Sequence, residues 1–230
     1  MKLGDIALDK GNYDLAISEY KRAAELDSSI NVEMKINQIN EKKIVQLLDA
    51  GDYDKSIEAG LKALEVSSSD SLREKLADAY ISRAWYYKSK RLNPYTLVDL
   101  NNAVNTAPEY YRTYYERGRF YNNQWQYNLA IPELSKSMTL KSDFAPAYNE
   151  RAFSYYKNEK WESALADVNR AIDLDAADAR FYYTRSLIYR ATKKYAPAID
   201  DLETTIKLTE DNGLLEAAGK ELTAIQALQP

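Results

Sequence analysis

The feature that most restricts how this chain can fold is a repeat of 34 residues. Three consecutive segments, 111–144, 145–178 and 179–212, align with one another without a gap. A fixed period of this length is typical of solenoid proteins, in which each repeat is one small unit that packs on its neighbours. The repeat therefore predicts a linear array of similar units.

Each segment carries two apolar patterns with spacing i, i+3, i+4 and i+7, separated by a short polar stretch. This spacing indicates two amphipathic helices in each repeat. With seven glycines and six prolines in 230 residues, the chain has few of the turns that a β-sandwich needs. We therefore expect an all-α fold, an α-solenoid of helical hairpins.

The register extends upstream through an aromatic position at the start of the second helix. This position holds Tyr13, Tyr53, Tyr127, Trp161 and Tyr195. The interval from Tyr13 to Tyr53 is 40 residues, and a further 40 reaches Asn93, which predicts longer first helices near 31–50 and 70–90.

About six hairpins in a single solenoid domain follow from this register. We expect them near 1–30, 37–70, 77–110, 111–144, 145–178 and 179–212, with a capping helix over 213–228. Because the first hairpin starts inside its pattern at Met1, we expect the chain to be a piece of a longer protein.

Two further columns predict how the helices of a hairpin meet. Small residues recur late in the second helix, as Ala23, Ala63, Ala103, Ser137, Ala171 and Thr205, which predicts close helix packing there. An arginine of the first helix recurs 16 residues before an acid of the second, in the pairs Arg117–Glu133, Arg151–Asp167 and Arg185–Asp201. We expect each of these pairs to form an ion pair within its hairpin.

The first helices carry an aromatic residue, then a small residue, then a tyrosine. These positions hold Tyr114, Gly118 and Tyr121, then Tyr148, Ala152 and Tyr155, then Tyr182, Ser186 and Tyr189. The pattern resembles the tetratricopeptide repeat over nearly the whole chain. The resemblance implies a right-handed superhelix whose first helices line a concave groove that binds partner proteins.

One subclass of that family holds acidic chaperone tails in a clamp of basic and asparagine residues. The matching columns in the last three repeats hold Tyr115, Arg119, Glu150, Arg180 and Thr184. Because few of these are basic, the sequence disfavours the chaperone-clamp subclass.

Composition excludes several other functions. The net charge of −4 provides no basic field for a nucleic acid, and no apolar run is long enough to cross a membrane. Without cysteine or histidine the chain lacks the usual nucleophiles, general bases and zinc ligands, so we expect neither an enzyme nor a cofactor. The compartment stays open: the cytoplasm is the default, and an extracytoplasmic domain of an anchored protein is the alternative.

The predicted function is a protein-interaction module or scaffold that binds a peptide or helix of a partner protein in the groove. The candidate contact residues are Trp85, Arg112, Tyr115, Arg119, Asn122, Asn149, Phe153, Tyr156, Arg180, Tyr183 and Arg190. Tyrosine, tryptophan and arginine are enriched at binding hot spots, and the arginines favour an acidic ligand.

Two alternatives remain. The chain could instead be a structural scaffold that self-associates into a homo-oligomer. A weaker alternative is an enzyme that uses the paired carboxylates of Glu116 and Glu150.

Overall fold

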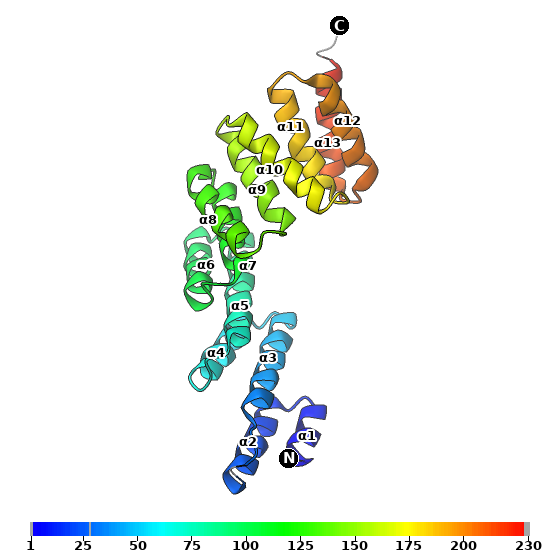
Figure 1. Cartoon of the computed structure of the whole chain (residues 1–230). Helices are drawn as coiled ribbons and strands as arrows, with labels where there is room; N and C mark the ends of the chain where they lie inside the picture. Colours follow the sequence, from blue (N-terminus) through cyan, green and yellow to red (C-terminus); the bar gives the residue numbers. More distant parts are fainter. Residues whose placement is uncertain (1, 28, 228–230) are drawn as a thin grey trace. The chain divides into compact units, whose positions relative to one another are not determined.

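The computed structural model of the protein describes residues 2–27 and 29–227 (Figure 1). Within this part of the chain there are thirteen α-helices and no strand, so the all-α helical repeat fold is confirmed. Met1 and residue 228, the expected end of the capping helix, lie outside the described residues. Across those same residues, no helix combines the length and the apolar character needed to cross a membrane.

The chain divides between Thr113 and Tyr114 into two compact units, each described here by itself. The first unit contains α1 (Lys2–Asp9), α2 (Tyr13–Leu26), α3 (Glu33–Asp49), α4 (Tyr53–Leu64), α5 (Asp70–Ser89), α6 (Asn93–Thr106) and the start of α7 (Tyr111–Asn123). The second contains the rest of α7, α8 (Tyr127–Leu140), α9 (Ala145–Lys157), α10 (Trp161–Leu174), α11 (Ala179–Ala191), α12 (Tyr195–Leu208) and α13 (Asn212–Gln226). The single solenoid domain stays a prediction.

The turn inside each hairpin repeats one backbone conformation. Among the residues that the structure describes, six have positive φ, each two residues before a second helix begins: Gly11 (70°), Gly51 (76°), Arg91 (61°), Trp125 (61°), Glu159 (58°) and Lys193 (59°). The second helices begin at the aromatic column of the sequence, with Asn93 in the third place. The first helices α3 and α5 have 17 and 20 residues against 13 in α7, α9 and α11, so the predicted longer helices are present.

Close packing inside the hairpins depends on the small-residue columns. A Cβ atom added at Gly118 would lie 2.7 Å from Cγ of Leu134 on the paired helix, nearer than real side chains approach. In the later repeats Ala152 and Ala171 are fully buried between helices. The two helices therefore approach so closely that a larger side chain at these positions would push them apart.

The three predicted ion pairs are confirmed, and a fourth belongs to the same column. Arg151 donates from Nε and Nη2 to the two carboxylate oxygens of Asp167 at 2.7 and 2.8 Å. Arg117 and Arg185 bind Glu133 and Asp201 through the same two nitrogens. One repeat upstream of Arg117, Arg83 donates to both oxygens of Asp99 at 2.7 Å, a pair that was not predicted from the sequence.

The helix after the last hairpin covers that hairpin's apolar face, as predicted. Ala218 and Ile225 of α13 are buried in one cluster with Ala198 and Leu202 of α12. The capping helix therefore completes the core of the second unit.

Replacing Arg151 by alanine should lower the free energy of unfolding by about 2 kcal/mol, because Asp167 would remain largely buried without its charged partner. Chemical denaturation followed by circular dichroism measures the change. Arg170→Ala on the exposed side of α10 is the matched control, with an expected change of less than about 0.5 kcal/mol. Equal stabilities for the two variants would contradict the structural role of the pair.

Two glycines with empty space around them should respond to alanine in opposite directions. Gly51 has φ +76° and Gly219 lies within α13, and an added Cβ would meet no atom within 4 Å at either. Gly51→Ala should cost about 1 kcal/mol because the left-handed conformation disfavours a side chain. Gly219→Ala should stabilise by about 0.5 to 1 kcal/mol through helix propensity. Thermal denaturation of both variants tests this, and a gain at Gly51 would contradict the turn geometry.

Candidate partner-binding face

The first helices of the second unit lie side by side and are followed by the capping helix. Asn122 of α7 donates from Nδ2 to the backbone oxygen and to Oε2 of Glu150 on α9, at 3.0 and 2.9 Å. Helix α9 packs against α11, and Arg190 of α11 forms an ion pair with Glu221 of α13. Nine of the predicted contact residues lie on these helices, and we call them the first-helix face: Tyr115, Arg119, Asn122, Asn149, Phe153, Tyr156, Arg180, Tyr183 and Arg190.

Two members of the first-helix face are buried and support it from beneath. Tyr115 is 8% exposed, and its ring meets the edge of Phe144 with centroids 4.9 Å apart. This burial raises the pKa of the Tyr115 hydroxyl well above its usual range. Asn122 is 6% exposed and accepts a hydrogen bond from Ser154 Oγ at 2.7 Å. Both side chains are thus held by the protein's own packing.

An aromatic row runs along the α9 part of the face. Centroid distances are 6.2 Å from Tyr127 to Phe153, 6.1 Å from Phe153 to Tyr156, and 5.8 Å from Tyr156 to Trp161. The ammonium group of Lys157 lies 5.2 and 5.1 Å from the centroids of the Phe153 and Tyr156 rings. Phe153 and Tyr156 are half-buried, so their positions are fixed while part of each ring stays accessible.

Asn149 has an unsatisfied polar atom. Its Oδ1 is buried and accepts no hydrogen bond from the described residues, although the residue as a whole is only half-buried. An acceptor left without a donor in this way costs about 1–3 kcal/mol.

The arginines of the predicted site are all paired with acids of the chain. Arg119 Nη1 lies 2.8 Å from Glu116 Oε2, and its Nε lies 3.9 Å from Glu150. Arg180 pairs with Asp178, and Arg190 pairs with Glu221. The pairing of Arg119 with Glu116 could have been predicted from the sequence, because the two residues are three positions apart on one helix. The pairing of Arg190 with Glu221 could not, because Glu221 lies on the capping helix, outside the 34-residue repeat.

The two remaining predicted residues belong to the first unit. Arg112 donates to Asp78 Oδ1 at 2.9 Å, and Trp85 is half-buried on α5. They are therefore not part of the first-helix face as defined on the second unit. No group of three or more acids within residues 2–27 and 29–227 is placed to hold a metal ion.

The carboxyl group of Glu150, which accepts a hydrogen bond from Asn122 of the face, has a shifted pKa. Burial raises the pKa of Glu150 and the nearby charge of Glu116 adds to the rise, while Asn122, Arg119 and Arg180 oppose it. The folded protein therefore binds the Glu150 proton more tightly than the unfolded chain does. Glu150 therefore contributes most to the free energy of unfolding below its pKa in the unfolded chain, which is about 4.3 for glutamate. This contribution is lost as the pH rises through the higher pKa that Glu150 has in the folded protein.

Glu150→Gln should remove this pH dependence. The unfolding free energy of the variant minus that of the parent should increase as the pH rises from about 4 to about 7. Denaturant titrations at several pH values measure the difference, with Glu162→Gln on the exposed side of α10 as the control. A difference that stays constant or decreases with pH would show that Glu150 is not strained by its burial.

Two segments of the chain match models of a known protein family. Residues 149–213 and residues 1–30 each match a model of the tetratricopeptide repeat. No curated protein matches the sequence.

Solved structures share the fold. YrrB, a tetratricopeptide repeat protein with an unusual peptide-binding site, is 17% identical with a TM-score of 0.59, over 87% of this chain and 97% of YrrB. A thermophilic tetratricopeptide repeat protein of Thermus thermophilus, TTC0263, is 17% identical with a TM-score of 0.55, over 81% of this chain and 99% of TTC0263. A chain of the APC/C hetero-tetramer Cut9–Hcn1 is 15% identical with a TM-score of 0.63, and the match covers 96% of this chain but 41% of that one. These identities show a common fold alone, and the matched family models place tetratricopeptide repeats at residues 1–30 and 149–213 of this chain.

Proposed function

We propose that the chain is a non-enzymatic protein-interaction module, and that the first-helix face of the second unit holds a segment of a partner protein. The observation that carries the proposal is the half-buried aromatic row of α9, held in place by its neighbours, beside the half-buried carboxamide of Asn149. Asn149, Phe153 and Tyr156 are spaced i, i+4 and i+7, so they form one stripe along the helix.

This stripe has the chemistry that a polypeptide ligand needs. The half-buried carboxamide of Asn149 can form hydrogen bonds with the ligand backbone, and the two rings offer rigid apolar area to its side chains. Because the rings are already held by Tyr127, Trp161 and Lys157, little side-chain entropy is lost on the protein side when the ligand binds. The peptide-binding site of YrrB supports the proposal at the level of the fold.

The charge of the ligand follows from the pairing of the arginines. Since Arg119, Arg180 and Arg190 each have an acidic partner, an acidic ligand has to replace Glu116, Asp178 or Glu221 in those pairs. Each exchange trades one ion pair for another, so the net gain is small. The acidic ligand predicted from the sequence stays a prediction, and the aromatic and amide contacts are the ones on which this proposal rests.

Self-association is the second candidate function. Leu3 and Ile6 of α1 and Leu15 of α2 are exposed apolar side chains within the first hairpin. Such side chains favour contact with a second copy of the chain. Sedimentation velocity at several concentrations distinguishes this function, because the peptide-binding module requires no oligomer.

The test of the main proposal is capture of partners from a cell lysate, identified by mass spectrometry. The triple variant Asn149→Ala, Phe153→Ala and Tyr156→Ala should reduce capture of specific partners at least about tenfold, because it removes both the acceptor and the apolar contact area.

A matched triple variant on α10 provides the control: Glu162→Ala, Ser163→Ala and Arg170→Ala, all at exposed positions. It should capture partners like the parent, and circular dichroism should show equal helicity for all three proteins. Undiminished capture by the first triple variant would contradict the assignment of this face.

A further inference from the structure

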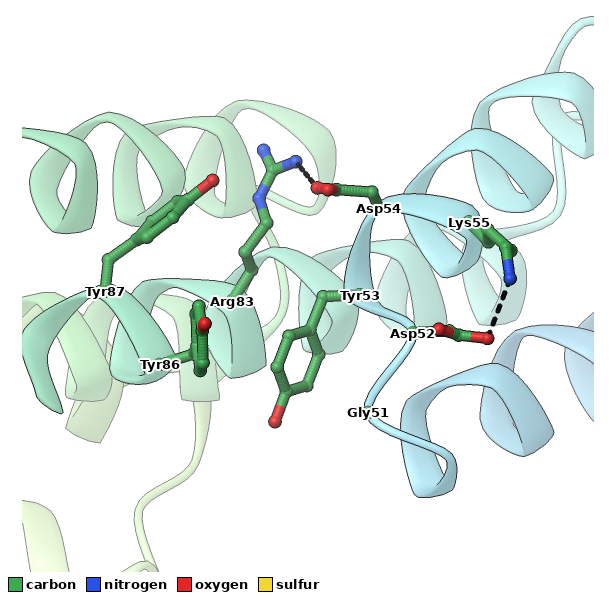
Figure 2. Close-up of a pocket in the computed structure, with 8 residues that line it drawn as sticks. All are labelled: Gly51, Asp52, Tyr53, Asp54, Lys55, Arg83, Tyr86 and Tyr87. Atoms are coloured by element: carbon green, nitrogen blue, oxygen red, sulfur yellow. Dashed lines mark hydrogen bonds and ion pairs between the residues drawn. The ribbon is translucent and has the colours of Figure 1, made fainter. Parts of the chain in front are cut away.

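The first unit contains a pocket that does not involve the first-helix face. Figure 2 shows it between the start of α4 and the last turns of α5, with a volume of about 350 Å³. Its lining consists of Gly51, Asp52, Tyr53, Asp54, Lys55, Arg83, Tyr86 and Tyr87. This volume lies within the range of sites that bind small ligands or single segments of peptide.

A row of four tyrosines passes through this pocket and continues onto α6. Centroid distances are 5.6 Å from Tyr53 to Tyr86, 6.0 Å from Tyr86 to Tyr87, and 5.7 Å from Tyr87 to Tyr95. Successive rings are tilted by 45°, 53° and 48°, so neighbouring rings enclose wedges instead of stacking flat. Tyr86 and Tyr95 are 45% and 59% exposed, and Val98, one turn after Tyr95, is exposed as well.

The charged residues of the pocket are neutralised within the unit. Arg83 is held on both sides, by Asp99 at 2.7 Å and by Asp54 at 2.6 Å, and Figure 2 shows the guanidinium reaching toward Asp54. Lys55 pairs with Asp52 at 3.0 Å. An ionic ligand would have to break one of these pairs, so the pocket favours an uncharged ligand.

The tyrosine hydroxyls add directional polarity to this surface, beside the ammonium group of Lys90, which lies 5.5 Å from the centroid of the Tyr86 ring. Among the described residues, the hydroxyls of Tyr86 and Tyr95 form no hydrogen bond to the chain, and both residues face solvent. A phenolic hydroxyl can donate to a carbonyl oxygen. The ligand should therefore offer carbonyl acceptors together with compact apolar groups that fit between tilted rings.

From these observations we infer that the tyrosine row binds a proline-rich segment in the polyproline II conformation. Such a segment is extended and uncharged, its proline rings fit between aromatic side chains, and its carbonyl groups remain free to accept hydrogen bonds because proline has no N–H. The helix has three residues per turn and rises about 3.1 Å per residue, so proline rings recur on one face about every 9 Å and can enter the wedges between the tyrosine rings. The inference is independent of the function proposed for the first-helix face.

The experiment is isothermal titration calorimetry of the full chain with a capped decaproline peptide, compared with a glycine-serine decapeptide of the same length. Decaproline should bind and the glycine-serine peptide should not. Tyr86→Ala and Tyr95→Ala should each weaken binding about tenfold, and Tyr86→Phe should weaken it less, because it removes only the hydroxyl. Tyr95 and Tyr86 are exposed enough that circular dichroism should show unchanged helicity, and Tyr86→Phe serves if Tyr86→Ala does not fold.

A variant of the second unit is the control: Trp125→Ala removes an exposed aromatic residue outside the pocket and should bind decaproline like the parent. An equal loss with Trp125→Ala would show non-specific attraction to aromatic surfaces and overturn the inference. Absence of decaproline binding, or tighter binding of an alternating glycine-lysine decapeptide, would overturn it as well.

Discussion

A bidentate ion pair between an arginine and a carboxylate joins the two helices in four of the hairpins, and the orientation of these helices depends on it. In α9, Arg151 points toward Asp167 of α10, and this fixes the rotation of α9 about its own axis. Residues two positions away along a helix are turned by about 200°, so Asn149 and Phe153 must project on the opposite side. The same geometry relates Arg117 to Arg119 and Arg185 to Tyr183. In these hairpins the pair thus also determines which side chains form the first-helix face.

The parts of the structure that repeat could be predicted from the sequence. The starts of the second helices, the small-residue columns and the Arg–acid pairs follow from one period, because each hairpin has to fit the next in the same way. The pair of Arg83 and Asp99 was available to the same reasoning, since Arg83 lies 34 residues before Arg117.

The contacts that could not be predicted from the sequence occur in single repeats and do not recur with the period. Tyr115 occupies the column of Asn149, yet it is buried because Phe144 packs on it, and only the folded structure brings that ring into contact. Glu221 neutralises Arg190 from a helix outside the period. The predicted arginine-rich surface is consequently a set of compensated ion pairs, and the uncompensated groups are a carboxamide and aromatic rings.

Both candidate binding surfaces share this property. In the first-helix face and in the tyrosine pocket, arginines position the structure through internal pairs, while aromatic rings and neutral hydrogen-bonding groups are left for a ligand. Such surfaces select among ligands by shape and hydrogen bonding, because long-range attraction between net charges contributes little to binding there.

The central claim, that the Arg–acid pair holds the two helices of a hairpin in register, is tested most directly by a double-mutant cycle. Unfolding free energies of the parent, Arg151→Ala, Asp167→Ala and the double variant give the coupling energy between the two side chains. We expect a coupling energy of at least about 1 kcal/mol, with the double variant more stable than the sum of the two single changes implies. Strictly additive changes would mean that the two side chains act independently and that the register of the hairpin has another origin.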